Sequence, residues 1–493
     1  MDHFQQPLTL VIDQGSHASR TALFTAQGEL ISLASKDVST QSLQQGWYEQ
    51  DASEILLSVT NLLHELKSAN PDGKNPTQTE NIKNCCLCTQ RSSIVAWDKQ
   101  TGTPLSPVIS WRDLRNQSWL DNMDRRDFDI QRITGLPLSG HYSASKIRWL
   151  LDNNTDVQGA LDKQRLCIAP LASFLLFHLL QGNPFLIDHT NAQRSQLFDI
   201  NSLSWSDELL QAFNIDESLL PETQPVSYPY GKLSILDIPM TAVCGDQNAA
   251  WHAYPTMQLP KAVINIGTGA FIMSSAREKA QKPLLLRSII NSSENSFEYT
   301  TEGTVNGAGA AISWLQNRYP CHDLFEQLPD WLSRLPCPPV FINTVSGLGS
   351  PWWCTGGEPE FMSHNITLAE RYVSAIESII FLLYKNIQQL ETTPAIFFIS
   401  GGLSQLDGLC QRLADLSNAK VIRFCETQSS ARGCAWLANQ IVNENETNQA
   451  SKAGLHKIIS PKIEKEFTPQ KNKLISKRYE QFVGELNRRC YND

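Results

Sequence analysis

Two aspartates stand at the ends of apolar strands, where a sheet can hold a side chain rigidly. Asp246 follows the short apolar run in TAVCGDQNAAW, residues 241–251, and lies between Gly245 and Gln247. A carboxylate held by a strand end is well placed for chemistry, because its direction is fixed. The same residue would also make a good N-cap for the helix that follows. The pattern leaves a catalytic group and a helix cap as the alternatives.

The second aspartate, Asp13, lies in LTLVIDQGSHASRTALFT, residues 8–25. This pattern predicts a buried strand, a tight polar turn at 13–19 and a second strand. Gly15 allows the turn with little steric cost, and small polar neighbours leave room for an anion at exposed N–H groups. Asp13 would offer an oxygen ligand to a metal bound to that anion. A phosphate-binding hairpin of a kinase and an ordinary hairpin turn are both compatible with these residues.

A similar pattern begins at residue 261. The segment KAVINIGTGAFIMSSA predicts a strand, a turn at Gly267-Thr268-Gly269 and a second strand. Two matched hairpins about 250 residues apart, each opening a domain-sized segment, indicate an internal duplication.

Two further glycine pairs could bring the backbone close to a ligand. Gly307-x-Gly309 precedes a predicted helix, but it lacks the third glycine of a dinucleotide fingerprint, and no Walker A pattern occurs. Gly401-Gly402 follows the apolar strand AIFFIS, where a ligand contact and a tight turn are equally open. The sequence therefore argues against a Rossmann or P-loop nucleotide site.

The elements that would position these residues alternate between strands and helices. Asp51 and Glu54 form a capping-box pattern before an apolar helical face, and Thr367 and Glu370 form another. Strands interleaved with hairpins and helices predict a mixed α/β sheet.

The composition narrows the class of protein. A length of 493 residues predicts two or three domains. With 41% hydrophobic and 18% charged residues, the chain has the composition of an ordinary soluble globular protein, and its net charge of −9 disfavours nucleic acid and anionic membrane as partners. No signal peptide is expected. The most apolar run, 166–180, is too short to span a bilayer and lies among helices predicted over 145–220, which a polar stretch interrupts at 183–195.

The twelve cysteines are scattered without paired metal spacing. Cys85, Cys86 and Cys88 fall in NCCLCTQ, a predicted buried strand in which Cys packs as a small hydrophobe. Zinc binding by Cys86 and Cys88 is the alternative, although no His or second Cys pair follows at usable spacing. We therefore expect reduced thiols in a cytoplasmic protein.

The chain resembles the FGGY carbohydrate kinases, and glycerol kinases are the nearest branch. The resemblance rests on motifs in the family's order: VIDQGSHASR, GWYEQD, TQRSSIVAWDKQTGTPL, ISWRDLR, TGLPLSGHYSASKIRWLLDN, FDINSLSW, GDQNAA, INIGTGAF, SGLGSPWW and ISGG. It implies an α/β fold of two actin-like, ribonuclease H-like ATPase domains around a central cleft. The implied division is 1–252 with the acceptor pocket, 253–443 with the nucleotide site, and 444–493 as a polar linker and helix-like tail on the core.

The resemblance also implies roles. Asp246 would contact the substrate as the base that accepts a hydroxyl proton, and with Asp13 it would bind Mg²⁺. Because the proton can move late in a loose phosphoryl transfer, Asp246 needs no large rise above its ordinary pKa. The implied acceptor contacts are Arg91, Ser92, Trp111, His141, Gln247 and Phe271. The implied ATP contacts are Gly15, Ser16, His17, Arg20, Thr268, Gly309, Ser313 and Gly402.

Several positions depart from the glycerol kinase pattern. Ser92 replaces a glutamate and His141 an aromatic residue, and both changes argue against glycerol and favour a related polyol or ketose. On the nucleotide side, Ser16-His17 replaces two threonines, Ser313 a glutamine and Leu406 an asparagine. His17 could donate to a phosphate oxygen or be a tolerated turn residue.

Two functions follow from these observations. One is an ATP-dependent kinase for a small polyol or sugar, and the other is a degenerate family member that binds sugar or nucleotide without turnover. Six retained residues favour the kinase, namely Asp13, Gly15, Arg20, Asp246, Thr268 and Gly402. The acceptor, the regulation and the oligomeric state stay open, with a homodimer and a homotetramer as the alternatives.

Overall fold

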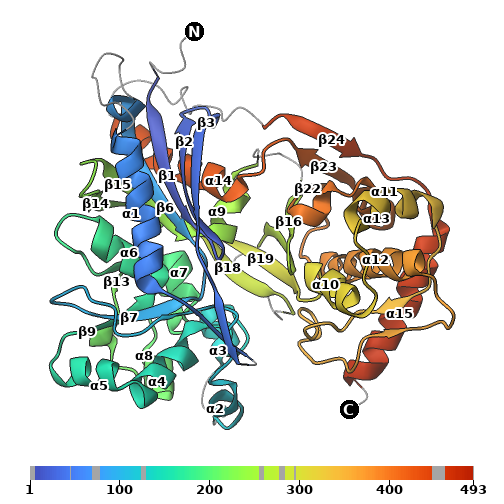
Figure 1. The fold of residues 1–493 in the computed structure, drawn as a ribbon, viewed down its shortest axis with the longest axis horizontal. Coiled ribbons are helices and arrows are strands. Elements are labelled where there is room, and N and C mark those ends of the chain that lie inside the picture. The colour runs from blue at the N-terminus through green and yellow to red at the C-terminus, as the bar shows by residue number, and fades with distance from the viewer. Residues whose placement is uncertain are drawn as a thin grey trace. The chain divides into compact units, whose positions relative to one another are not determined.

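The protein folds into two compact units, and each unit combines segments that are separate in the sequence (Figure 1). The structure is a computed structural model, and it describes residues 6–44, 46–68, 78–123, 129–254, 260–276, 284–293, 296–446 and 461–491. Unit 1 comprises Met1–Pro255, Ser288–Glu298 and Gln428–Ser460, and unit 2 comprises Thr256–Arg287, Tyr299–Thr427 and Pro461–Asp493.

The bounds of these units differ from those that the family resemblance implied, which divided the chain into contiguous domains after residues 252 and 443. Residues 428–460 return to unit 1, because α14 (Ser429–Glu446) packs against its central sheet. The end of the chain joins unit 2, where β24 (Ile463–Phe467) pairs with β23 (Lys420–Phe424). A chain that returns to an earlier sheet leaves no local mark in the sequence, so these assignments required tertiary contacts.

The central sheet of unit 1 has the strand order β14-β15-β6-β1-β2-β3. The strands β1, β6 and β15 are parallel neighbours, whereas β2, β3 and β14 run antiparallel to the strands beside them. Parallel strands end at the same edge of a sheet, so the carboxyl ends of β1, β6 and β15 lie together. The bounds are β1 Leu8–Gln14, β2 Ala18–Thr25, β3 Leu30–Asp37, β6 Ile82–Thr89, β14 Ser227–Lys232 and β15 Pro239–Gly245.

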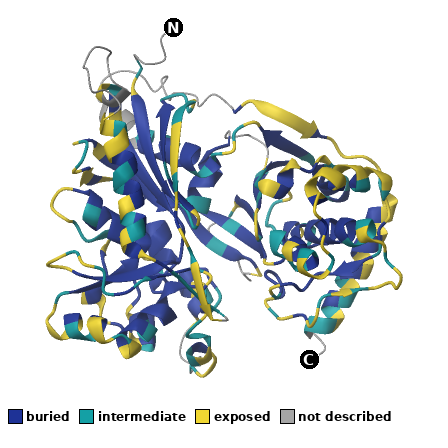
Figure 2. Ribbon diagram, viewed as in Figure 1, coloured by how far each residue is buried: buried dark blue, intermediate teal, exposed yellow. Residues whose placement is uncertain are grey.

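The inner strands β1, β2, β6 and β15 of this sheet are buried, whereas the edge strands β3 and β14 are largely exposed or half-buried (Figure 2). On one face, α14 packs against alternate residues such as Cys86 and Cys88 of β6. The helix α1 (Ala52–Ser68) contacts β2 and β3. Of its predicted apolar face, Ile55, Val59, Leu62 and Leu63 are buried and Leu66 is half-buried. Both cysteines of the zinc alternative are therefore core residues.

The two predicted capping boxes have different outcomes. At Thr367, both reciprocal hydrogen bonds with Glu370 are present, and that prediction is confirmed. At Asp51, the carboxylate accepts from the backbone N–H groups of Ser53 and Glu54. The Glu54 carboxylate accepts from the backbone N–H and hydroxyl of Ser39 instead of from the backbone N–H of Asp51. The prediction of a reciprocal capping box is therefore wrong here.

A second sheet of unit 1, ordered β4-β5-β8-β7-β9, carries the segments with the predicted acceptor residues. The strand β9 (Leu166–Pro170) pairs with β7 (Ile94–Asp98), so the helical prediction over 145–220 is wrong there. The other strands are β4 Gln41–Gln44, β5 Trp47–Gln50 and β8 Val108–Ile109. The helices nearby are α2 Gln117–Asp121, α3 Ile130–Thr134, α4 Ser143–Asn153, α5 Thr155–Asp162, α6 Leu171–Leu179, α7 His189–Gln193 and α8 Asp207–Phe213. Short pairs are formed by β10 Leu186–Asp188 with β13 Glu222–Gln224, and by β11 Phe198–Asp199 with β12 Ser204–Trp205.

The strands of unit 2 repeat the strand plan of unit 1 in the order β19-β17-β16-β22-β23-β24, within a sheet whose full order begins with β18. The strands β16 (Lys261–Ile266) and β17 (Ala270–Ser275) form an antiparallel hairpin, as β1 and β2 do. The strand β22 (Ile396–Ser400) is parallel to β16 and to β23, as β6 is to β1 and β15. The predicted duplication is therefore visible in the topology. The remaining strands are β18 Leu286–Ser292, β19 Phe297–Val305, β20 Phe341–Ile342 and β21 Glu360–Phe361.

The core of unit 2 forms around α12 (Leu368–Ile387), most of which is buried (Figure 2). Its neighbours include α11, α13 and α15, and the pairs of aromatic rings between α12 and α15 include Phe381 with Phe482. The helices are α10 Gly309–Arg318, α11 Leu324–Arg334, α13 Asp407–Ser417 and α15 Lys473–Tyr491. Across both units, the described residues also include 3₁₀ turns at Gln78–Asn81, Glu217–Leu219 and Gly402–Gln405.

One disulfide joins Cys354 to Cys490, so the expectation of reduced thiols is wrong for this pair. The two residues are 136 positions apart in the sequence, and their Cα atoms are 6.4 Å apart. The bond links the loop after β20 to α15. Because the separation is so large, spacing along the chain gave no indication of the pair.

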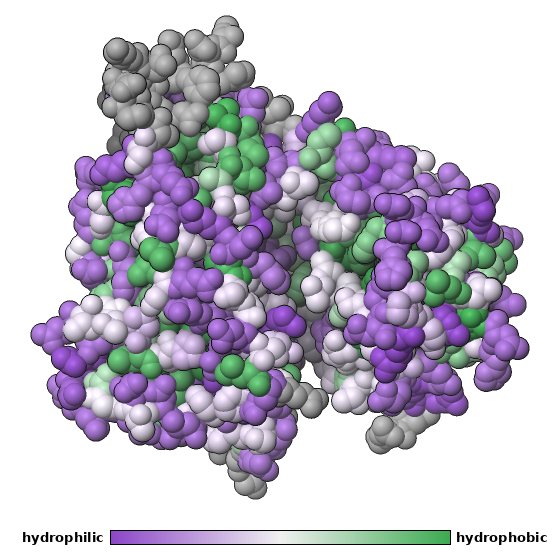
Figure 3. Space-filling model, in the orientation of Figure 1, coloured by the Kyte–Doolittle hydropathy of each residue, from purple (hydrophilic) through white to green (hydrophobic). Residues whose placement is uncertain are grey.

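Hydrophilic residues cover most of the face shown in Figure 3, with small apolar groups between them. In the parts of the chain that the structure describes, no helix is both long and apolar enough to cross a membrane.

Candidate active site

The two aspartates lie at neighbouring strand ends of the central sheet of unit 1. In the register of the sheet, Asp13 of β1 pairs with Cys88 of β6, and Cys88 pairs with Cys244 of β15. Two residues after Cys244, Asp246 begins α9 (Asp246–His252). Gly245 is the N-cap of that helix, so the prediction that Asp246 serves as the cap is wrong.

The pKa of the Asp246 carboxyl is raised to about 6: burial raises it most, the positive charge of Arg91 lowers it, and the negative charge of Asp13 adds to the rise. Burial also raises the pKa of Asp13, and the positive charge of Arg20 opposes that effect. Asp246 remains 26% exposed, whereas the side chain of Asp13 is 9% exposed. The site therefore holds two carboxylates close enough to influence each other, and the outer one is accessible.

Two arginines stand beside the carboxylates. Arg20 Nη1 lies 3.4 Å from Asp13 Oδ2, and Arg91 Nε lies 3.8 Å from Asp246 Oδ1. Arg91 Nη1 also donates to Asn248 Oδ1 at 3.1 Å, which fixes the direction of the guanidinium. A Cβ at Gly245 would lie 2.7 Å from both Cγ and Cδ of Arg91. A glycine at this position therefore leaves room for the Arg91 side chain to pass directly over the backbone.

The turn of the first hairpin is tied to the segment that carries Trp111. Trp111 Nε1 donates to Ser16 Oγ at 2.9 Å, and Ser16 Oγ donates to Gln90 Oε1 at 3.3 Å. The backbone N–H of Gly15 donates to the carbonyl of Ala18 at 2.9 Å, which closes the turn. His17 is exposed beside them. The Ser16 hydroxyl, which was predicted to contact phosphate, thus already has two side-chain partners, Trp111 and Gln90.

The predicted acceptor residues of unit 1 come from separate segments. Arg91 and Ser92 follow β6, Trp111 follows β8, and His141 precedes α4; the ring centres of Trp111 and His141 are 5.5 Å apart. Ser92 is buried at φ 64°, and its Oγ has no hydrogen-bond partner within the described chain, nor does the buried Oε1 of Gln247. Buried polar atoms without partners are rare and suit a ligand that brings hydroxyl groups.

Two groups of residues near this site were missed by the sequence analysis. The first is in α7, read from the sequence as a polar interruption but buried in the structure. Thr190 Oγ1 accepts from the backbone N–H of Gly245 at 2.8 Å and donates to Asp188, so this pair anchors the residue before Asp246. An Asp before a short helix is an N-cap pattern that could have indicated α7. The second is Lys146, a fully buried lysine in α4 that is treated below.

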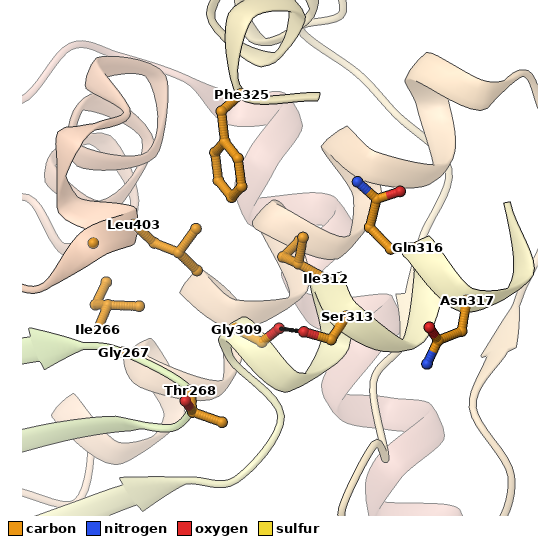
Figure 4. Close-up of a pocket in the computed structure, with 11 residues that line it drawn as sticks. Ile266, Gly267, Thr268, Gly309, Ile312, Ser313, Gln316, Asn317, Phe325 and Leu403 are labelled. Carbon is orange, nitrogen blue, oxygen red and sulfur yellow. Dashed lines mark hydrogen bonds between the residues drawn. The ribbon is translucent and has the colours of Figure 1, made fainter. Parts of the chain in front are cut away.

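A pocket of about 640 Å³ lies in unit 2 between the second hairpin and α10 (Figure 4). Four predicted nucleotide contacts line it, namely Thr268, Gly309, Ser313 and Gly402. The backbone N–H of Gly309 donates to the carbonyl of Gly267 at 2.9 Å, so the start of α10 packs directly on the hairpin turn. The pocket also has an apolar side formed by Ile266, Ile312, Phe325 and Leu403.

In the glycine pair after β22, Gly401 forms a tight turn and Gly402 borders the pocket, so both alternatives given for the pair apply. Gly401 has φ 92°, and a Cβ there would lie 2.5 Å from the carbonyl oxygen of Ile266, so this glycine is required by the turn. Gly402 has open space beside it and lines the pocket. Phe271, predicted in the acceptor pocket, lies half-buried in β17 of unit 2 and is not among the residues around the 640 Å³ pocket.

Among the described residues, no group of three or more His, Cys, Asp or Glu side chains could hold a metal ion. The carboxylates of Asp13 and Asp246 form a pair, and a pair is sufficient for Mg²⁺ when phosphate oxygens and water supply the other ligands.

The fold and these two sites define a two-domain α/β protein of the actin-like ATPase class. The family description for the N-terminal domain of the FGGY family of carbohydrate kinases matches residues 8–247, and that for the C-terminal domain matches residues 262–440. The chain belongs to the FGGY family of carbohydrate kinases. It is a phosphotransferase that uses ATP and an alcohol group as acceptor.

Curated relatives and solved structures agree with this assignment. The chain is 28% identical to glycerol kinase 1 of Clostridium tetani, over 93% of this chain and 94% of that protein. It is 30% identical to a glycerol kinase of Citrifermentans bemidjiense, over 93% and 95% respectively. The fold is similar to Plasmodium falciparum glycerol kinase with ADP, with a TM-score of 0.85 and 24% identity over 99% of this chain and 98% of that one. A ligand-bound xylulose kinase from Lactobacillus acidophilus has a TM-score of 0.79 and 19% identity, over 99% and 97%.

Proposed function

We propose that this protein transfers the γ-phosphoryl group of ATP to a hydroxyl of a small polyol or ketose, with Asp246 as the base. The observation that carries the proposal is the position of Asp246 at a strand end, partly exposed, beside Arg91 and with a pKa raised to about 6 by burial. Such a carboxylate is ionised at neutral pH and can still take up a proton as the bond to phosphorus forms. The pKa is higher than the role requires, which makes Asp246 a better base than an exposed aspartate.

The acceptor residues support a hydroxylated substrate. Arg91 can make forked hydrogen bonds to vicinal hydroxyls, and Trp111 supplies an apolar wall. The unpaired Oγ of Ser92 and Oε1 of Gln247 offer further polar contacts. Ser92 lacks the carboxylate expected in a glycerol site, and His141 lies where an aromatic residue is expected, so the proposed acceptor is a polyol or ketose other than glycerol.

The proposal includes Mg²⁺ bound by Asp13 and Asp246. The charge of Asp13 raises the pKa of Asp246, and a divalent cation beside such a pair would remove this repulsion. When bound, the ion would neutralise part of the charge on the phosphate groups. Arg20 lies next to Asp13 and can contribute a second positive group to the same phosphates.

For the nucleotide, we propose the pocket of unit 2. The turn at Thr268 and the open backbone at Gly402 suit phosphate groups, and the apolar side with Ile312 and Phe325 suits the base. The ring of Phe325 points into the pocket from α11 (Figure 4), although the side chain is 60% exposed. A large exposed aromatic side chain over a pocket is typical of a residue that stacks on a ligand.

Replacing Phe325 with alanine is therefore expected to weaken ATP binding. We expect the KM for ATP to rise about tenfold with kcat and the acceptor KM changed less than about twofold, because loss of one base–aromatic contact is worth about 1–3 kcal/mol. Steady-state kinetics at varied ATP measure the effect. Phe297→Ala, which removes another exposed phenylalanine outside the pocket, is the control. An unchanged KM for ATP in Phe325→Ala would exclude the stacking role.

A coupled ADP-release assay tests the proposed function. The panel contains glycerol, erythritol, pentitols, pentuloses and hexuloses, each with saturating Mg-ATP. We expect turnover with at least one polyol or ketose and a lower kcat/KM with glycerol. Binding of a panel compound without ADP release from any of them would favour the degenerate, non-catalytic alternative, which the altered residues Ser16, His17, Ser313 and Leu406 motivate.

The proposed compartment is the cytoplasm, which supplies ATP. The Cys354–Cys490 disulfide is the observation against it, because cytosolic thiols are usually reduced. Free-thiol labelling of the protein in cell lysate, followed by mass spectrometry, distinguishes the two states.

A further inference from the structure

Lys146 of unit 1 is a lysine whose side chain is completely buried. Its Nζ donates to three backbone carbonyls: His141 at 2.7 Å, Ser110 at 2.9 Å and Ser92 at 3.5 Å. An ammonium has three N–H donors, so these carbonyls use its full capacity.

The three carbonyls belong to three different segments of the chain. Ser92 follows β6, Ser110 follows β8, and His141 precedes α4. Ser92 and His141 are themselves predicted acceptor contacts, and Ser110 directly adjoins a third, Trp111. Lys146 is thus the common hydrogen-bond donor of the segments that would surround the acceptor.

The local charges show that Lys146 is not there to form an ion pair. No ion pair of Lys146 with a carboxylate occurs within the described chain, and the nearby Asp113 is bound by Arg115 at 2.8 Å. Burial lowers the pKa of Lys146 to about 7, Asp113 opposes this effect, and Arg115 adds to it. Burying a cation without a charged partner is unfavourable. An apolar side chain of similar volume would avoid this cost, but it would remove one donor from each of the three carbonyls. The carbonyl of Ser92 would keep the Ser143 hydroxyl at 3.3 Å, and that of Ser110 would keep the backbone N–H of Asp113 at 3.0 Å.

We propose that Lys146 is a positioning residue of the acceptor site, whose ammonium holds together the backbone segments that carry Arg91, Trp111 and His141 and so sets the affinity for a hydroxylated acceptor. This inference rests on the proposed function, since it takes those residues to bind the acceptor. Lys146 is not itself among the proposed ATP contacts, although Trp111 donates to Ser16, which is one of them. Loss of Lys146 should therefore act on the acceptor more than on ATP.

The test compares Lys146→Met and Lys146→Gln with the full-length wild-type protein. In Lys146→Met all three carbonyls lose the ammonium that joins them, although those of Ser92 and Ser110 keep a second donor, whereas the amide of Lys146→Gln can replace part of the set. We expect the acceptor KM to rise about tenfold or more in Lys146→Met and less in Lys146→Gln, while the KM for ATP and the Kd for ADP change less than about twofold. The acceptor is the panel compound with the highest wild-type kcat/KM.

The matched control is Arg148→Met on the same helix. Arg148 also donates to a backbone carbonyl, that of Asn214 at 2.6 Å, but this carbonyl is remote from the acceptor residues in sequence. Hydrogen exchange followed by mass spectrometry gives a readout without activity: segments 89–93, 108–112 and 139–143 should all exchange faster in Lys146→Gln and not in Arg148→Met. Because this measurement uses Lys146→Gln, it tests the proposal even if Lys146→Met does not fold.

The outcomes separate the two proposals. Turnover by the wild type with an unchanged acceptor KM in Lys146→Gln, or exchange that rises only within α4, overturns the role of Lys146 and leaves the proposed function intact. A purely structural role would lower kcat per milligram, through loss of folded protein, without changing the acceptor KM. Absence of turnover by the wild type with every panel compound overturns the proposed function and, with it, the acceptor role of Lys146.

Discussion

Asp246→Asn is expected to reduce kcat by about three orders of magnitude while the KM values for ATP and acceptor change less than about threefold, because general base catalysis contributes about 10²–10⁴-fold. Asparagine keeps the shape and hydrogen-bonding oxygen of the aspartate, but it cannot accept the proton of the acceptor hydroxyl. The ADP-release assay measures kcat, and calorimetry measures acceptor binding. Unchanged kcat would refute the assignment of Asp246 as the base.

Asp237→Asn is the matched control for this substitution. Asp237 is an exposed aspartate of unit 1 that pairs with Lys232 at 3.0 Å, so the same chemical change there should leave kcat unaltered. Two carboxylates of one unit are thereby compared, and only one of them adjoins Arg91.

The same substitution has an expected effect on stability, with a sign that follows from the raised pKa. The folded protein binds a proton at Asp246 up to about pH 6, whereas the unfolded chain releases it near 3.8. The carboxyl therefore lowers the free energy of unfolding progressively as the pH rises from 3.8 to about 6, and the loss is complete above that. In metal-free buffer, Asp246→Asn should be more stable than the wild type at pH 7 by about 1–2 kcal/mol, since two pKa units correspond to about 3 kcal/mol and the carboxyl is partly solvated.

Denaturant unfolding in the presence of a chelator measures this difference. It should become small by about pH 3.5, where the carboxyl is mostly protonated in both states. A stability gain that persisted at pH 3.5 would show that the gain comes from packing and not from the charge.

Gly433→Ala is expected to destabilise the protein severely. Gly433 lies in α14 where this helix crosses α9, and a Cβ there would overlap the carbonyl oxygen of Ala249 and lie 2.7 Å from its carbonyl carbon. Both sides of the contact are backbone, so a rotamer change cannot relieve it. We expect a loss of roughly 3 kcal/mol or more and a fall in Tm of about 10 °C, because overpacking costs about 1–3 kcal/mol even where side chains can adjust.

The substitution should also affect activity, because α9 begins at Asp246 and a shift of that helix moves the proposed base. The helices α9 and α14 are also packed closely at a second point, where the rings of His252 and Trp436 stack with their centres 4.7 Å apart. Calorimetry and the ADP-release assay on the folded fraction measure the two effects.

Gly159→Ala is the control for this substitution. Gly159 also lies in a helix of unit 1, α5, but nothing is within 4 Å of its added Cβ. Alanine there should leave Tm unchanged or raise it, since glycine within a helix costs about 0.5–1 kcal/mol relative to alanine. Equal Tm values for the two variants would refute the packing argument.

Much of the fold could be predicted because its signals are local. Alternating apolar residues and a glycine turn indicate the two hairpins, and the position of Asp13 and Asp246 follows from where their strands end. The helix α1 and its buried face follow from spacing alone. The four nucleotide residues that line the pocket in unit 2 were also identified from local motifs, and their role stays a prediction.

Other features of the site could not be predicted, because they depend on contacts with residues that no sequence pattern identifies. The partners of Lys146 are backbone carbonyls, which every residue type offers, so no pattern could indicate them. The polar residues of α7 resemble a surface loop until the packing around them is known. The exposed Phe325 resembles any surface aromatic residue until the pocket beside it is seen.

By itself, the sequence determined the two hairpins, the carboxylates at the strand ends and the family, because each rests on residues that are adjacent in the chain. Only the tertiary structure decided that Asp246 has a raised pKa, that Cys354 meets Cys490, and that residues 428–460 return to unit 1. These properties arise from desolvation and from contacts between distant segments. They depend on which surfaces are buried together, and this is decided when the elements pack.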